Sequence, residues 1–252
     1  MKKIIPLILA VVLLSSMSVP AFAATSVSDD CDVIVSYVEK TAETPVVSVT
    51  IEWEGMAFTY EAASDPVWNA ETHQYEEQKG GWKEGVGTIT ITNDSDMILK
   101  AGLIYSKADK YGDIDMMFTH KAPYIGSAFN KAEGGGDACA VQVQAVPVGD
   151  MTKPDTEEAT IGNIKVTVES VSEWTEVVSD IENEYGNLMV PSGTAADRGT
   201  AYFESETVRD TVQAAYDDLM LLVDGGTTEG PELNAKLNAL ITAYYNAIKI
   251  GQ

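Results

Sequence analysis

Basic residues are scarce in this chain. Lysine and arginine together number 16, against 39 aspartates and glutamates, and the formal net charge is −23. Such a surface repels phosphate groups, so we expect no nucleic-acid partner and no attraction to anionic membranes. The acids are spread along the chain, which is typical of a solvated exterior. Because 45% of the residues are hydrophobic, the chain can still bury a core.

Sequence motifs for catalysis and cofactor binding are also missing. The chain has no G-x-S-x-G elbow, P-loop or dinucleotide fingerprint. The sequence therefore predicts no catalytic residue and no cofactor. Of the two histidines, His120 follows a strand pattern and is expected at its rim. The acids Asp109, Asp113 and Asp115 are weak calcium candidates, because their spacing lacks the order of an EF-hand loop. An acidic turn is the favoured interpretation.

Long apolar runs are confined to the beginning of the chain. Lys2 and Lys3 precede the apolar run 4–14, and Ala21-Phe22-Ala23 forms an A-x-A cleavage site. This pattern predicts a secretory signal peptide, residues 1–23, and an extracellular product that is free or associated with the cell surface. An uncleaved membrane anchor is the alternative. We expect no membrane span in the mature chain.

The only two cysteines are Cys31 and Cys139. Each opens an alternating apolar pattern and shares its inward face. In an exported chain these positions favour a disulfide. The bridge would close a loop of about 100 residues and contribute about 4 to 5 kcal/mol in the chain-entropy model. Two separate buried thiols are the alternative.

Period-two patterning dominates residues 32–169 and predicts a β-domain at 24–170. About eight short strands with irregular connections indicate an antiparallel sandwich. The turn 93–96 is expected to join two neighbouring strands in a hairpin. The predicted strands are 32–38, 45–54, 56–60, 86–93, 97–106, 113–119, 139–148 and 163–170.

Helical spacing replaces this pattern in residues 171–252. A first helix is expected to end near Gly186, with Ser170 and Glu173 as a capping box. Two further helices, within 207–248, are expected to form a helical hairpin. Their apolar stripes must be covered by the first helix, the sandwich or a partner. Of the adjacent Tyr244 and Tyr245, one is expected to point outward as an anchor for a protein or cell-envelope partner.

Residues 53–82 contain three tryptophans. Trp53, Phe58 and Tyr60 are expected on strands, with at least one of them buried. The following residues do not alternate and predict a long connection. Its aromatics pin the loop or, alternatively, bind a glycan by stacking. The ligand-binding candidates in this connection are Trp68, His73, Tyr75 and Trp82.

The same stretch resembles an uncharacterised family of secreted proteins from Gram-positive anaerobic bacteria. That family's pattern is W-x-x-M-x-F-x-Y, then W-N-x-x-T-H-x-Y, then G-W, then I-T-V-T-N-x-S. The chain departs from it at Ala70, Asp94 and Asp96. The resemblance implies an exported Ig-like β-domain and supplies no catalytic residue. The matching residues are Trp53, Met56, Phe58, Tyr60, Trp68, Asn69, Thr72, His73, Tyr75, Gly81, Trp82, Ile89, Thr90, Thr92, Asn93 and Ser95.

These observations predict an α+β fold: an antiparallel Ig-like β-sandwich followed by a helical segment that ends in a helical hairpin. The favoured function is a secreted or cell-surface-associated, non-enzymatic structural or interaction protein that binds its partner through the C-terminal helices. Two alternatives remain from other classes: an extracellular module that binds glycan or calcium, and a hydrolase whose site has no sequence motif.

Overall fold

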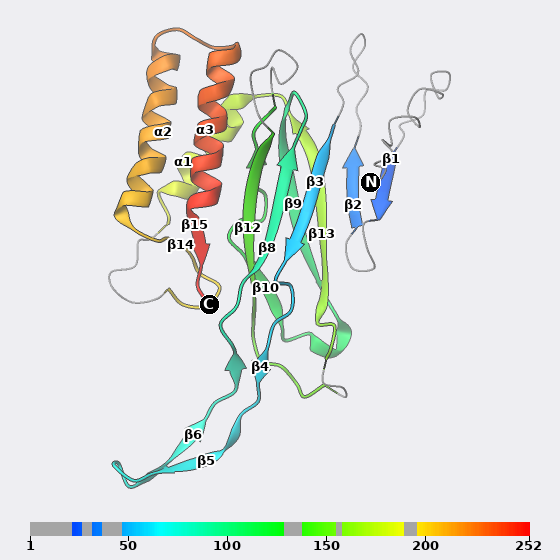
Figure 1. The fold of residues 1–252 in the computed structure, drawn as a ribbon, viewed down its shortest axis with the longest axis vertical. Coiled ribbons are helices and arrows are strands. Elements are labelled where there is room, and N and C mark those ends of the chain that lie inside the picture. The colour runs from blue at the N-terminus through cyan, green and yellow to red at the C-terminus, as the bar shows by residue number, and fades with distance from the viewer. Residues whose placement is uncertain (1–21, 27–31, 37–46, 129–137, 155–157, 189–195) are drawn as a thin grey trace, which may run out of the picture.

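The fold is seen in a computed structural model that describes residues 22–26, 32–36, 47–128, 138–154, 158–188 and 196–252. It combines several sheets of mainly antiparallel strands with three α-helices, so the predicted α+β class is confirmed. The molecule is elongated, with the helices on one side and a narrow β-ribbon extending from one end (Figure 1).

The larger sheet has the strand order β1-β2-β13-β9-β11. Its long strands β9 and β13 are antiparallel along their whole length, from the pair Gly162–Lys107 to the pair Val171–Ile98. Strand β2 pairs in parallel with β13, and β1 pairs with β2. The bounds are β1 (Phe22–Ser26), β2 (Asp32–Ser36), β9 (Ile98–Lys107), β11 (Tyr124–Ile125) and β13 (Gly162–Val171).

The second sheet has the order β10-β12-β8-β3 and is antiparallel throughout. In β8 and β12, buried residues alternate with more exposed ones, as expected for strands with one face on the core. A single-turn 3₁₀ helix, Asp109–Tyr111, precedes β10. The bounds are β3 (Val49–Glu54), β8 (Gly87–Asn93), β10 (Asp115–Phe118) and β12 (Cys139–Val148).

The expected hairpin at 93–96 is wrong, because β8 and β9 lie in different sheets. The turn instead carries the chain across the core. The buried Asn93 side chain donates to the carbonyls of Met97 and Gly126, and its oxygen accepts the N–H of Ser95. Ser95 in turn accepts the N–H of Ser48. These bonds satisfy buried polar groups that a solvent-exposed hairpin turn would leave to water.

The described residues also contain three helices: α1 (Trp174–Tyr185), α2 (Glu206–Asp224) and α3 (Pro231–Ala247). Helices α2 and α3 lie side by side (Figure 1), and an ion pair of 2.7 Å joins Lys236 to Asp218. The predicted capping box is wrong, since α1 begins after Glu173 without a side-chain cap. Strands β14 (Ala201–Phe203) and β15 (Ile248–Ile250), which the sequence analysis missed, pair with each other.

Helix α3 covers the open side between the two sheets. Asn246 accepts the N–H of Gln142 in β12 and donates to the carbonyl of Ala140. About two helical turns earlier, Asn238 accepts the N–H of Ser127 and donates to the carbonyl of Ser127. The helix therefore satisfies backbone groups that an uncovered strand edge would expose.

One continuous cluster of buried side chains joins both sheets and all three helices. Ile91 and Val143 come from one sheet and Leu103 and Val166 from the other. The helices contribute their apolar stripes, which are therefore covered within the chain. Both Tyr244 and Tyr245 are buried, so the expected outward-pointing tyrosine is wrong. The helical members are Val177, Val178, Ile181, Val212, Leu219, Leu233, Leu237, Leu240, Ile241, Tyr244 and Tyr245.

Within the described part of the chain, none of the helices combines the length and the apolar character needed to cross a bilayer.

Candidate functional site

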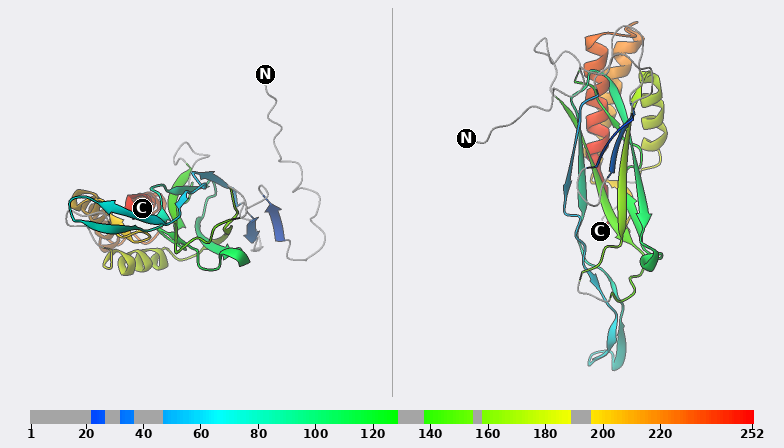
Figure 2. Two further views of the ribbon diagram at one scale, coloured as in Figure 1. Left: turned by 90° about the horizontal axis from the view of Figure 1, so that it is seen from below. Right: turned by 90° about the vertical axis from the view of Figure 1, so that its right-hand side faces the viewer.

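Residues 60–82 form a narrow β-ribbon, the arm, which extends beyond the ends of both sheets (Figures 1 and 2). Two pairs of short strands build it: β4 (Tyr60–Glu61) with β7 (Gly81–Trp82), then β5 (Ser64–Asn69) with β6 (Gln74–Gln78). The predicted strand 56–60 and the predicted irregular connection are therefore both wrong. Within the described part of the chain these strands pair only with each other and bury no face, so they carry no alternating pattern.

The base of the arm is held close to the sheets. Gly55 has a φ of +68°, and an added Cβ would lie 2.8 Å from the carbonyl oxygen of Val86. Only glycine suits such a close approach of two chain segments. Trp82 packs edge-on against Tyr60 at 5.1 Å, and its Nε1 donates to the carbonyl of Gly149 at 2.8 Å. Trp82 thus fastens the arm to the loop after β12.

The arm tip, residues 64–78, exposes the largest apolar side chains of the ribbon. Trp68 and Tyr75 are directly opposite each other on β5 and β6, with ring centroids 5.2 Å apart. Their exposed fractions are 49% and 70%, and that of the neighbouring Val67 is 57%. His73 lies in the turn with a φ of +53°, and its ring centroid is 6.2 Å from that of Trp68. The tip therefore presents a small aromatic surface.

Local hydrogen bonds shape the turn at the tip. The side-chain oxygen of Asn69 accepts the N–H groups of Glu71, at 2.8 Å, and Thr72. Its amide donates to Glu76 on the opposite strand. This Asx-type turn closes the ribbon without burying apolar surface.

The exposed aromatics at the tip contact each other across the ribbon but contribute nothing to the core. A two-stranded ribbon is marginally stable in water, and none of its side chains belongs to the core. Exposed Trp and Tyr side chains together are unusual on a surface this acidic and are a mark of binding surfaces. The tip has four carboxylates, Asp65, Glu71, Glu76 and Glu77, and one lysine, Lys79, follows it.

Of the four ligand-binding candidates, the structure brings three together. Trp68, His73 and Tyr75 meet at the tip, whereas Trp82 lies on the separate β4–β7 pair. Trp68 and Trp82 therefore lie on different strand pairs of the arm. The other aromatics stay near the sheets. Trp53 on β3, Tyr60 on β4 and Phe58 outside the strands are all half-buried, so the expectations that Phe58 lies on a strand and that one of the three is buried are wrong.

The calcium candidates do not converge. Asp115 forms an ion pair of 3.3 Å with Lys107, and its other oxygen accepts the N–H of Met116. Asp109 begins the 3₁₀ helix, and Asp113 follows it. Among the residues that the structure describes, no group of three acidic, histidine or cysteine side chains is arranged to hold a metal ion.

The predicted disulfide stays a prediction, because Cys31 lies outside the described residues. Cys139 begins β12, and its Sγ lies 3.5 Å from the carbonyl oxygen of Ser127. The predicted cleavage site is described only from Phe22 onward, where the chain enters β1.

Sequence reasoning missed a row of carboxylates on α1 that docks this helix. Glu176 and Asp180 both approach the hydroxyl of Tyr124, at 2.9 and 2.6 Å, and Lys100 pairs with both. Burial, then the hydrogen bonds to Asp180 and Glu176, raises the pKa of Tyr124. The bond from Tyr124 holds the pKa of Asp180 below its usual value. The four-residue spacing of the acids was the available signal, but their partners are distant in sequence.

The third carboxylate of this row, Glu184, contacts His120. The expectation that His120 lies at a rim is wrong, because it is buried beside Tyr244 and Tyr245. Its Nδ1 lies 3.6 Å from Glu184, and Tyr244 donates to the same carboxylate oxygen at 3.0 Å. The close contact with His120, together with the hydrogen bond from Tyr244, lowers the pKa of Glu184, against the effect of burial. His120 thus belongs to the contact between α1, α3 and the sheet.

Comparison with known proteins adds no relative: no protein-family profile, no curated protein and no solved structure matches the chain.

Proposed function

We propose that the protein is a secreted or cell-surface-associated, non-enzymatic interaction protein. In this proposal the two sheets are an Ig-like β-sandwich, and α2 and α3 are a helical hairpin that closes its open side. The sandwich holds the arm away from the body of the molecule, and the arm tip binds the partner. The observation that carries the proposal is the exposed group Val67, Trp68 and Tyr75 at the tip.

The chemistry of the tip suggests the kind of surface that it binds. Trp and Tyr contribute large contact areas with few rotatable bonds, which makes them effective at binding hot spots. The surrounding carboxylates favour a partner with basic residues around an apolar groove. They also disfavour the pairing of two arms, since like charges would then face each other.

Substitutions at the tip test the proposal, because they should remove binding and leave the protein folded. Because the tip is outside the core and these rings contact only each other across the ribbon, replacing Trp68 and Tyr75 by serine should change the free energy of unfolding by no more than about 1 kcal/mol. Binding to the cell-envelope fraction of the producing cell should fall by about 30-fold or more, as for an aromatic hot spot. Cosedimentation with this fraction measures the binding, and thermal unfolding measures the stability.

Helix α2 provides both the matched control and the second candidate surface. Leu221 is 75% exposed, and it is the side chain that favours a partner on the C-terminal helices. The substitution Leu221→Ser removes an exposed apolar side chain of the same kind from the helices. If only this variant loses binding, the partner binds the helices. If the double variant at the tip binds normally, the arm proposal is wrong.

A further inference from the structure

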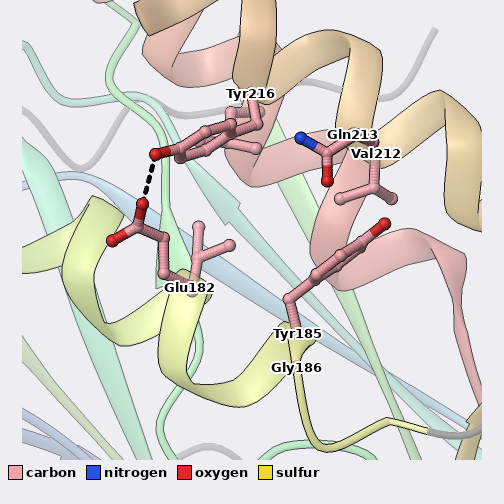
Figure 3. A pocket seen from close by; sticks show the side chains of 8 residues that line it. Glu182, Tyr185, Gly186, Val212, Gln213 and Tyr216 are labelled. Atoms are coloured by element: carbon pink, nitrogen blue, oxygen red, sulfur yellow. Dashed lines mark hydrogen bonds between the residues drawn. The ribbon is translucent and has the colours of Figure 1, made fainter.

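A pocket of about 200 Å³ opens between α1 and α2, on the helical side of the molecule (Figure 3). Its apolar floor is formed by Ile181, Val212 and Leu240, which are buried members of the core. Pockets for drug-sized ligands are roughly 300 to 1,000 Å³. This pocket therefore suits a group of only a few non-hydrogen atoms.

Two aromatic side chains and one carboxylate surround the opening. Tyr185 from α1 and Tyr216 from α2 line the pocket, and the hydroxyl of Tyr216 donates to the carboxylate of Glu182 (Figure 3). Aromatic faces carry partial negative charge and attract cations. The hydrogen bond places the carboxylate beside the ring of Tyr216.

Among the residues that line the pocket, Glu182 carries the charge. The pKa of Tyr216 is raised to about 12 by its hydrogen bond to Glu182, by partial burial, and by the carboxylates of Glu182, Asp217 and Asp224. The chain itself shows that Tyr185 accepts a cation, because the guanidinium of Arg209 lies 5.3 Å from the centre of its ring. Arg209 does not line the pocket.

We propose that this pocket binds a small organic ammonium ion. The alkyl groups of the ion contact the floor of Ile181, Val212 and Leu240. Its positive charge lies near the rings of Tyr185 and Tyr216 and the carboxylate of Glu182. The same carboxylate repels an anion, and a neutral molecule of equal shape gains only the apolar contact.

Three probes of similar size and different charge separate these contributions. They are tetramethylammonium, tert-butanol and trimethylacetate, each titrated into the full chain while the methyl NMR signals of Ile181, Val212 and Leu240 are recorded. Tetramethylammonium should shift these signals saturably, with a Kd on the order of 1 mM for so few atoms. The other two probes should bind at least about tenfold more weakly, the difference expected from cation–π and charge contacts.

Two variants with the same change of charge locate the site. Glu182→Gln should weaken tetramethylammonium binding by about tenfold, as expected for loss of a close ionic contact. Glu232→Gln, in the exposed first turn of α3, should leave it unchanged. Thermal unfolding of both variants checks that the fold is retained. Tyr216→Phe keeps the ring without its hydrogen bond to Glu182, so it should bind within about threefold of the original chain.

Several results would overturn the proposal. Equal binding of tert-butanol would mean that the pocket is apolar and does not select for charge. Equal binding of trimethylacetate would mean that the pocket does not favour a positively charged ligand. The absence of saturable shifts, or equal losses in Glu182→Gln and Glu232→Gln, would also refute it. None of these outcomes bears on the arm, which lies at a different part of the molecule.

Discussion

The packing of α3 against the sheets leads to a prediction about cooperativity. Leu237 is fully buried in α3, within the cluster that joins the helices to both sheets. The substitution Leu237→Ala removes three buried carbons and leaves a cavity, which typically costs about 2 to 5 kcal/mol. This is a large share of the roughly 5 to 15 kcal/mol that stabilises a domain. Because the core is shared, we expect the whole molecule to become less stable.

Equilibrium unfolding in urea, followed by two signals, measures this effect. Tryptophan fluorescence reports mainly on β3 and the arm, which hold three of the four tryptophans. Far-ultraviolet circular dichroism reports mainly on the helices. Both signals should show one transition at the same urea concentration, and Leu237→Ala should lower both midpoints together. Leu221→Ala is the matched control, since that leucine is 75% exposed and should change the stability by about 0.5 kcal/mol or less.

Two separate transitions, with only the helical one displaced by Leu237→Ala, would refute a shared core. The same reasoning predicts the behaviour of a chain that ends before Ser205. Burying a large apolar side chain contributes about 1.5 to 3 kcal/mol, and α3 alone buries six of them. The lost contribution is comparable to the total stability, so the shortened chain should not fold.

Three further predictions concern other parts of the molecule. The folded-state pKa of Glu184 is below its ordinary value of 4.5, so its contribution to stability is present above that pH and is lost as the pH falls through the folded value. Glu184→Gln should therefore reduce the acid-induced drop in melting temperature, and a parallel drop in both proteins would contradict this. Asn93→Ala removes the side-chain donor to the carbonyls of Met97 and Gly126 and should cost about 1 to 3 kcal/mol, whereas Asp96→Ala, at an exposed position of the same turn, should cost far less when both are measured in urea. Mass spectrometry of the secreted protein should find Ala24 at its N-terminus; a product beginning at Met1 would show that the leader is retained.

The amino-acid sequence alone determined the elements that bury one face. Strands such as β8 and β12, and the apolar stripes of α2 and α3, follow from period-two and helical spacing, because burial on one side imposes that spacing. The aromatic stretch 53–82 was also found as a candidate region, with Trp68, His73 and Tyr75 among its residues. Local patterns of this kind depend only on neighbouring residues.

The tertiary structure decided everything that depends on partners distant in the chain. The turn 93–96 has the composition of a hairpin turn, yet the strands before and after it lie in different sheets. The side chains of Asn93 and Ser95 hydrogen-bond to Gly126 and Ser48, which are distant in the sequence. The strands of the arm have no buried face, so no spacing revealed them. The burial of Tyr245 and His120 follows from the position of α3 against the sheets. A single sequence does not reveal such contacts, because the free energy that selects them arises only when separated segments exclude water together.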